Sequence, residues 1–182
     1  KTYEVGVVSD LAYGALGYRG YENPSFLSTP GAKDVGIEFY TFSKTFNMAG
    51  WRLAFAAGNE QMIEALNLIQ DHLFVGIFPA LQEAGIAALL DPKSEEAVAQ
   101  LNATYDSRRD AFVQAAAKIG WKAFPSKGSF YAWMPVPEGY TSESFADLLL
   151  EKAHVAVAPG KGFGPAGDAY VRIGLLVDPK RL

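Results

Sequence analysis

Residues 41–54 are the most informative part of the chain and read Thr41-Phe42-Ser43-Lys44-Thr45-Phe46-Asn47-Met48-Ala49-Gly50-Trp51-Arg52-Leu53-Ala54. It places Lys44 in a predicted loop of small and hydroxyl-bearing residues, with Arg52 eight positions further on. Thr41 and Ser43 put hydroxyl groups just before the lysine. Hydroxyls and a guanidinium bind phosphate, and partial desolvation helps a lysine amine to lose its proton and act as a nucleophile. The stretch therefore predicts a nucleophilic amine beside phosphate-binding groups.

An acid and a phenol precede this stretch. Asp10 ends a short apolar run, and Tyr13 follows three residues later. Lysine, acid, phenol, hydroxyls and arginine are the groups that hold pyridoxal phosphate and use it. The amine condenses with the aldehyde, the acid keeps the pyridine nitrogen protonated, and the phenol lies beside the ring oxygen. These residue types together predict a pyridoxal phosphate site.

The lysine segment resembles the signature of class I/II (fold type I) aminotransferases, with Thr41 where Gly or Ser usually stands. Threonine keeps a hydroxyl, so the departure changes little. The resemblance implies that Lys44 is the catalytic lysine joined to the cofactor. It also implies that Thr41, Ser43 and Arg52 lie near the cofactor phosphate.

Two further segments carry the same resemblance. Residues 9–13 are similar to the family's segment that places an acid at the pyridine nitrogen and a tyrosine at the ring hydroxyl, which implies these roles for Asp10 and Tyr13. Residues 169–175 are similar to the family's strand whose arginine binds the substrate α-carboxylate, which implies this role for Arg172. The resemblance runs nearly from end to end of the chain.

Each of these segments also has a structural interpretation. A lysine after a serine in a loop is usually solvated, and an acid three residues before a tyrosine usually caps or turns the chain. Arg172 stands in an apolar strand, where an unpaired arginine is rare, and a structural ion pair would explain it equally well. The order and spacing of three separate segments favour the cofactor site.

The expected reaction moves an amino group between an amino acid and a 2-oxo acid. In the sequences of these motifs, the chain is similar to a bacillus-type branch that includes methionine-salvage and LL-diaminopimelate aminotransferases. Of these, methionine salvage is our preferred expectation. The alternatives are another fold type I enzyme using the same cofactor, such as a carbon–sulfur lyase, and a cofactor-free regulatory relative. The presence of Lys44, Asp10 and Arg52 argues against the regulatory relative. The family resemblance also implies a homodimer.

Composition excludes several other functions. Net charge is −4 and there is no basic block, so neither nucleic acid nor a membrane surface is an expected partner. Hydrophobic residues make up 49% and charged residues 20%, which is ordinary for a globular protein, and the cytoplasm is the expected location. The chain has no cysteine, and His72 and His154 lie far apart in sequence, so no metal site is predicted.

The pattern of apolar runs predicts an α/β fold. We expect part of the fold type I large domain in residues 1–100, with a mixed, mostly parallel sheet, and a smaller α+β domain in residues 101–182. Predicted strands cover residues 5–9, 37–43, 53–57, 121–124, 129–134, 155–158 and 169–177, and predicted helices cover residues 60–73, 80–90, 94–119 and 142–154. Residues 162–167 match a dinucleotide fingerprint by letter, but a strand follows them, so we interpret them as a loop.

Both ends of the chain are expected to be cut. Three strands of buried type lie in the first 58 residues without enough chain to cover them, and the resemblance implies a polypeptide about twice as long. The resemblance also calls for a glycine-rich phosphate loop and a ring-stacking aromatic that these residues do not supply. We therefore expect the chain alone to be catalytically silent.

Overall fold

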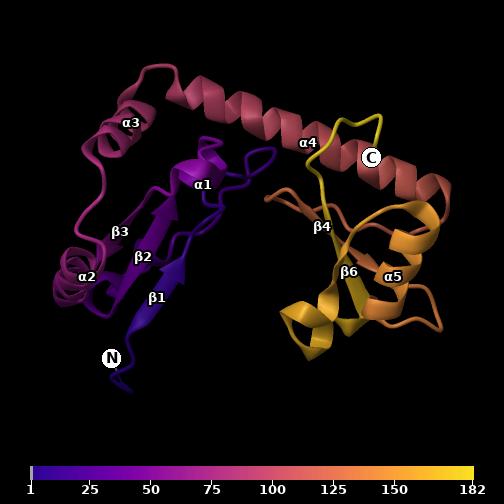
Figure 1. The fold of residues 1–182 in the computed structure, drawn as a ribbon, viewed down its shortest axis with the longest axis horizontal. Coiled ribbons are helices and arrows are strands. Elements are labelled where there is room, and N and C mark those ends of the chain that lie inside the picture. The colour runs from indigo at the N-terminus through magenta and orange to yellow at the C-terminus, as the bar shows by residue number, and fades with distance from the viewer. Residues whose placement is uncertain (1) are drawn as a thin grey trace. The chain divides into compact units, whose positions relative to one another are not determined.

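The computed structural model describes residues 2–182, which form two compact units, Lys1–Asn102 and Ala103–Leu182 (Figure 1). Each unit has a three-stranded sheet of its own. Long helix α4, Ser94–Lys118, begins in the first unit and continues into the second. No helix in residues 2–182 combines the length and the apolar composition needed to cross a membrane.

The sheet of the first unit has the order β1-β2-β3 (Figure 1). Its strands are β1, Val7–Asp10, β2, Gly36–Thr41, and β3, Ala54–Gly58. β1 and β2 run parallel, while β3 pairs antiparallel with β2. Val8 of β1 is 63% exposed, which agrees with the expectation that this chain is too short to cover its strands of buried type. β2 is the best covered of the three strands, as expected for the central one.

A buried carboxylate ties the connection between β1 and β2 to the sheet. Glu38 of β2 accepts hydrogen bonds from the Ser9 hydroxyl at 3.0 Å, the Ser25 hydroxyl at 2.6 Å and the Phe26 backbone N–H at 2.7 Å. A carboxylate away from water needs such donors, because desolvation without them is costly. Phe26 begins a short 3-10 helix, Phe26–Ser28, so this network fixes where the connection passes over the strand.

Helix α2, Glu60–Leu73, has the predicted bounds, and α3, Pro79–Leu90, begins one residue before its predicted start. The Asn59 side chain caps α2 by accepting from the Met62 N–H at 3.1 Å. α3 has proline in its first turn and ends at Asp91, which precedes a proline.

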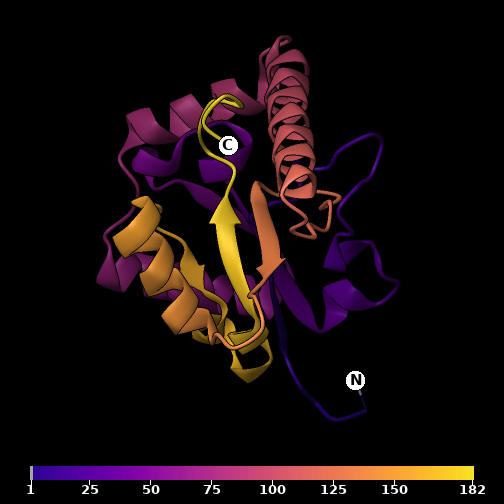
Figure 2. The ribbon, with the colours of Figure 1, turned by 90° about the vertical axis from the view of Figure 1, so that its right-hand side faces the viewer.

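The second unit packs α4 and α5, Ser142–Ala153, around one apolar core. Its sheet has the order β4-β6-β5, with all pairs antiparallel, and β4 and β6 lie side by side (Figure 2). These strands are β4, Tyr131–Pro135, β5, Ala158–Pro159, and β6, Tyr170–Gly174. The buried core residues are Phe112, Ala116, Ala132, Met134, Phe145, Ala146, Val171 and Leu175.

The predicted strand at residues 121–124 is absent from the described chain. The backbone N–H of Trp121 instead donates to the Ala116 carbonyl at 2.9 Å and closes the end of α4. Its indole N–H donates to the Pro135 carbonyl at 2.7 Å. Gly120 has a φ of +72°, a conformation that suits glycine after a helix. The backbone of Trp121 is thus used to end the helix, which takes it out of any strand.

Candidate functional site

The predicted residues of the first unit gather at one edge of its sheet. Because β1 and β2 are parallel, their carboxyl ends, Asp10 and Thr41, lie at the same edge. β3 begins at that edge too, since Ala54 is the register partner of Thr41. The Phe42 N–H donates to the Leu53 carbonyl at 3.1 Å and joins the turn after β2 to the turn before β3. Three segments distant in sequence therefore meet here.

Lys44 lies in a one-turn helix, α1, Phe42–Thr45, at the end of β2 (Figure 1). The prediction of an irregular loop is wrong at this point. The Thr41 hydroxyl accepts from the Ser43 N–H at 3.1 Å and donates to the Ser43 hydroxyl at 2.9 Å, which starts the helical turn. Lys44 is partly buried. Its place is thus set by the backbone of a capped turn.

Arg52 enters β3 from a left-handed backbone conformation. It has a φ of +52° and follows the 3-10 helix Ala49–Trp51, and its guanidinium donates to the Ala49 carbonyl at 3.0 Å. A non-glycine residue with positive φ is uncommon, and such residues cluster at functional sites. Arg52 is exposed.

Asp10 and Tyr13 stand at the start of a turn that sequence reasoning left undescribed. Asp10 is exposed and Tyr13 partly buried. The side-chain N–H groups of Asn23 donate to the carbonyls of Tyr13 at 3.0 Å, Gly14 at 3.3 Å and Leu16 at 3.1 Å. Asn23 is the residue that the sequence interpretation missed. The available signal was an amide side chain inside a segment rich in Gly and Pro, where loop carbonyls need donors.

Arg172 lies in the second unit, in the middle of β6, opposite Trp133 of β4 and Ala158 of β5. Its guanidinium carbon lies 4.0 Å from the ring centre of Tyr131 and 4.1 Å from that of Phe163. Both distances are well inside the range of cation–π attraction. Within residues 103–182, the partners of this guanidinium are thus aromatic rings, and no ion pair accounts for it.

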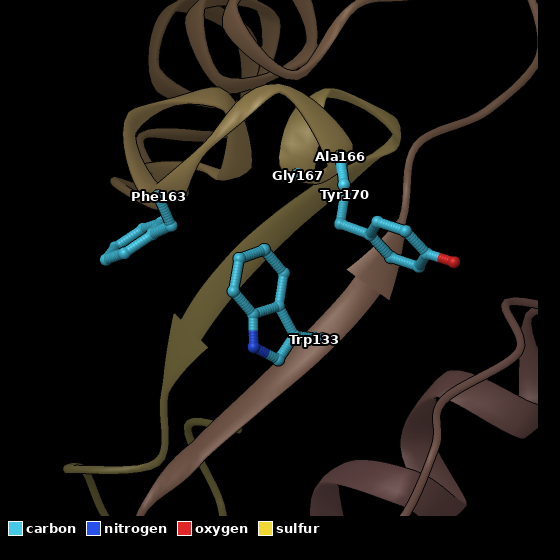
Figure 3. A pocket seen from close by; sticks show the side chains of 5 residues that line it. All are labelled: Trp133, Phe163, Ala166, Gly167 and Tyr170. Carbon is cyan, nitrogen blue, oxygen red and sulfur yellow. The ribbon is translucent and has the colours of Figure 1, made fainter. Parts of the chain in front are cut away.

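The same face of the second sheet carries an aromatic cavity of about 340 Å³ (Figure 3). It is lined by Trp133, Phe163, Ala166, Gly167 and Tyr170. The Trp133 ring meets Phe163 edge-on at 5.5 Å between ring centres and Tyr170 edge-on at 6.0 Å. Figure 3 shows the Trp133 ring between those of Phe163 and Tyr170. Phe163 links the cavity to Arg172, because its ring contacts both.

The turn that carries Phe163 is fixed at several points. Phe163 ends the 3-10 helix Gly160–Phe163, and Gly160 packs so closely against Gly167 that a Cβ on either would overlap the other's backbone. Asp168 accepts from the hydroxyl of fully buried Ser142 at 2.7 Å. This hydrogen bond is the main cause that lowers the pKa of the Asp168 carboxyl, and the Ser142 N–H acts in the same direction. The turn is therefore pinned to the start of α5.

The predicted site residues thus fall into two groups. Six lie in the first unit, at one edge of its sheet: Asp10, Tyr13, Thr41, Ser43, Lys44 and Arg52. Arg172 lies in the second unit. Within residues 2–182, no three His, Asp or Glu side chains are grouped so as to hold a metal ion.

Comparison with known proteins identifies the family. The family model for aminotransferase class I and II matches residues 1–182. The chain belongs to this family. It is 60% identical over 176 residues to L-glutamine--4-(methylsulfanyl)-2-oxobutanoate aminotransferase of Bacillus subtilis, covering 97% of this chain and 44% of that protein. It is 47% identical over 182 residues to LL-diaminopimelate aminotransferase of Moorella thermoacetica, covering 100% and 46%. The chain therefore spans about half the length of the curated relatives it matches.

Solved structures of this aminotransferase family agree with the fold. Substrate-bound BacF from Bacillus subtilis matches with a TM-score of 0.93 at 45% identity, over 98% of this chain and 45% of that one. The aromatic aminotransferase of Pyrococcus horikoshii matches with a TM-score of 0.93 at 34% identity, over 99% and 48%. The prediction of a fold type I α/β architecture is confirmed. Aminotransferases of this kind use pyridoxal phosphate.

Proposed function

We propose that the full-length protein is a pyridoxal phosphate-dependent aminotransferase that moves an amino group between an amino acid and a 2-oxo acid. The observation that carries this proposal is the meeting of three segments at one sheet edge. They bring the acid of β1, the lysine of α1 and the arginine before β3 to the same end of the sheet. Family membership supports it independently.

The groups at this edge fit the cofactor by their chemistry. The hydroxyls of Thr41 and Ser43 and the exposed guanidinium of Arg52 suit a phosphate, which accepts hydrogen bonds from all three. Exposed Asp10 is an acceptor for a protonated pyridine nitrogen, and the Tyr13 phenol is a donor for the ring oxygen. When bound, pyridoxal phosphate supplies an electron-accepting ring conjugated with the substrate nitrogen.

Lys44 is assigned the proton transfers. It would be the general base that takes the proton from the substrate Cα and the general acid that returns a proton two atoms away, beyond the substrate nitrogen. The capped turn that begins at Thr41 restricts the backbone of the lysine, so its amine has a limited range of positions.

Arg172 is assigned the substrate α-carboxylate. A guanidinium offers two parallel N–H donors to a carboxylate, which fixes orientation as well as distance. Holding the carboxylate sets the rotation about the Cα–N bond, and this rotation decides whether the Cα–H bond stands perpendicular to the cofactor ring. Only the perpendicular bond is aligned for proton removal.

Substrates, assembly and location are further proposals. Identity of 60% to a 4-(methylsulfanyl)-2-oxobutanoate aminotransferase favours methionine salvage, with LL-diaminopimelate aminotransfer as the alternative substrate class. We propose a homodimer, as the family resemblance implies, and a location in the cytoplasm, as expected from the composition. A carbon–sulfur lyase is the alternative reaction, because it would need the same four groups, Asp10, Lys44, Arg52 and Arg172.

A single half-reaction tests the proposal. Full-length protein loaded with pyridoxal phosphate is mixed with L-glutamine or L-methionine alone, and the cofactor spectrum is followed. An aminotransferase leaves the cofactor in its amine form after one turnover, and a 2-oxo acid then restores the aldehyde form. A spectrum that returns by itself, with release of a thiol and ammonia, would establish the lyase instead.

A further inference from the structure

Two aromatic rings lie against the guanidinium of Arg172. Tyr131 belongs to β4, the neighbour of β6, whereas Phe163 ends the 3-10 helix Gly160–Phe163. Their ring centres lie 4.0 Å and 4.1 Å from the same guanidinium carbon. Two separate elements therefore place a ring against one side chain.

Ring contacts suit a guanidinium that must also bind a carboxylate. An arginine that lies over a ring uses its flat surface for that contact, so the N–H groups along its edge stay available for hydrogen bonds in its own plane. An acidic partner would instead occupy that edge and compete with a ligand. Rings also hold a long, flexible side chain in one rotamer. The side chain then loses less conformational entropy when it binds a ligand.

Phe163 and the turn that carries it are held by more contacts than a ring at the surface needs. Phe163 is 51% exposed, so burial alone does not hold it. Trp133 meets it edge-on, and the turn that carries it is fastened by the contact of Gly160 with Gly167 and by the hydrogen bond from Ser142 to Asp168. This construction keeps the ring in place against the guanidinium.

We propose that Tyr131 and Phe163 are positioning residues that hold the Arg172 guanidinium for in-plane binding of the substrate carboxylate. The inference rests on the proposed function, because it takes Arg172 as the carboxylate ligand. The rings touch neither substrate nor cofactor in this account. They act through the arginine, so their removal should weaken carboxylate binding and leave other steps nearly unchanged.

The test uses full-length protein with Phe163→Leu and Tyr131→Leu, and the ring-preserving controls Phe163→Tyr and Tyr131→Phe. Calorimetry measures the dissociation constant of deaminated methionine, which keeps the carboxylate. Kinetics compare L-methionine with decarboxylated methionine, which lacks it. Each leucine variant should raise the dissociation constant and the KM for L-methionine about three- to tenfold, with kcat changed by less than about twofold. The ring-preserving controls should behave as the unmodified protein.

A cycle with Arg172→Ala separates positioning from structural support. On the Arg172→Ala background, loss of either ring should add nothing, and the reaction of decarboxylated methionine should be unaffected throughout. Equal losses for both methionine analogues, or losses that add to that of Arg172→Ala, would overturn the inference. So would unchanged carboxylate affinity in both leucine variants. If Tyr131→Leu fails to fold, Phe163→Leu decides alone, because its ring is half exposed.

Arg172→Ala also separates the inference from the proposed function. If Arg172→Ala leaves the affinity for deaminated methionine unchanged, the assignment of Arg172 to the carboxylate is wrong, and the inference falls with it. If Arg172→Ala weakens binding and the leucine variants do not, the proposed function stands and the inference alone is wrong.

Discussion

In the first unit, Asp10, Lys44 and Arg52 stand in or beside turns at the ends of three strands, whereas in the second unit Arg172 stands in the middle of a strand. The first group is held by hydrogen bonds of the turns themselves, such as that from the Ser43 N–H to the Thr41 hydroxyl. Arg172 is held by two aromatic rings. The two sheets thus present charged groups in two ways.

The difference follows from where backbone donors and acceptors are satisfied. At a strand end, the chain leaves the ladder, and hydroxyl and amide side chains complete the backbone hydrogen bonds while the next side chains point to the edge. In mid-strand the ladder already satisfies the backbone, so a charged side chain must find its support on the sheet face. For Arg172 that support comes from the ring of Tyr131, on the neighbouring strand β4, and from the ring of Phe163, in the turn before β6.

The largest expected effect in this comparison belongs to Lys44. Lys44→Ala should lower kcat by about 10²–10⁴-fold or more, the range for loss of a proton-transfer group, and should remove the visible absorbance of the bound cofactor. Stopped-flow spectra of full-length protein measure both. Exposed Lys33→Ala is the matched control and should change neither. Normal turnover in the Lys44→Ala variant would place the chemistry elsewhere.

Arg172→Ala should have the next largest effect. Breaking a hydrogen-bonded charge pair with the substrate should cost about 2–5 kcal/mol in kcat/KM, and cofactor absorbance should survive. Exposed Arg181→Ala, in the same unit, is the control. A variant that loses the cofactor but keeps substrate affinity would show that Arg172 acts in cofactor binding, together with the residues of the first unit. The distinction between the two units would then be wrong.

Glu38→Gln tests the hydrogen-bonded support of the first unit. An amide in place of the buried carboxylate keeps the shape but loses one acceptor for the Ser9, Ser25 and Phe26 donors. The free energy of unfolding should fall by about 1–3 kcal/mol. Urea titration measures the change, and exposed Glu60→Gln should alter it by less than about 0.5 kcal/mol. An unchanged free energy of unfolding would mean that the hydrogen bonds to Glu38 do not stabilise the first unit.

The smallest effect concerns the turn that carries Phe163. The pKa of the Asp168 carboxyl is lowered in the folded protein, chiefly by the Ser142 hydroxyl, so its contribution is present above the unfolded pKa and is lost as pH falls through the folded value. Lowering the pH below the ordinary value of 3.8 should therefore reduce the protection of the Ser142 amide against hydrogen exchange, measured relative to the intrinsic rate at the same pH. Asp168→Asn should abolish this pH dependence, while Asp147→Asn, on the exposed side of α5, should retain it.

Local signals made most of the fold predictable. Asn59 before α2, the proline after Asp91 and Gly120 after α4 each act through their own backbone or side chain, so a single sequence reveals them. The strand predicted at residues 121–124 failed because its apolar residues resemble a strand, while Trp121 is recruited by the Ala116 carbonyl at the helix end. That hydrogen bond depends on the three-dimensional geometry of the end of α4, which the apolar pattern of residues 121–124 does not reveal.

For the candidate site, the residue types were predictable but their supports were not. Lys44 and Arg52 stand close in sequence, and the parallel pairing of β1 with β2 brings Asp10 to the same edge. The rings beside Arg172 come from positions 41 and 9 residues away in sequence, and the register of β4 against β6 brings one of them, Tyr131, beside it. The role of Asn23 was equally hard to predict, because its three acceptors are backbone carbonyls of a turn, and the types of the residues in that turn do not reveal them.

The most direct test of the central claim is to identify the lysine that holds the cofactor. Full-length protein with bound pyridoxal phosphate is reduced with borohydride, digested and analysed by mass spectrometry. The account predicts a pyridoxyl group on Lys44, in the peptide that contains residues 41–52, at one group per chain. A pyridoxyl group on any other lysine of the protein, with Lys44 unmodified, would contradict it.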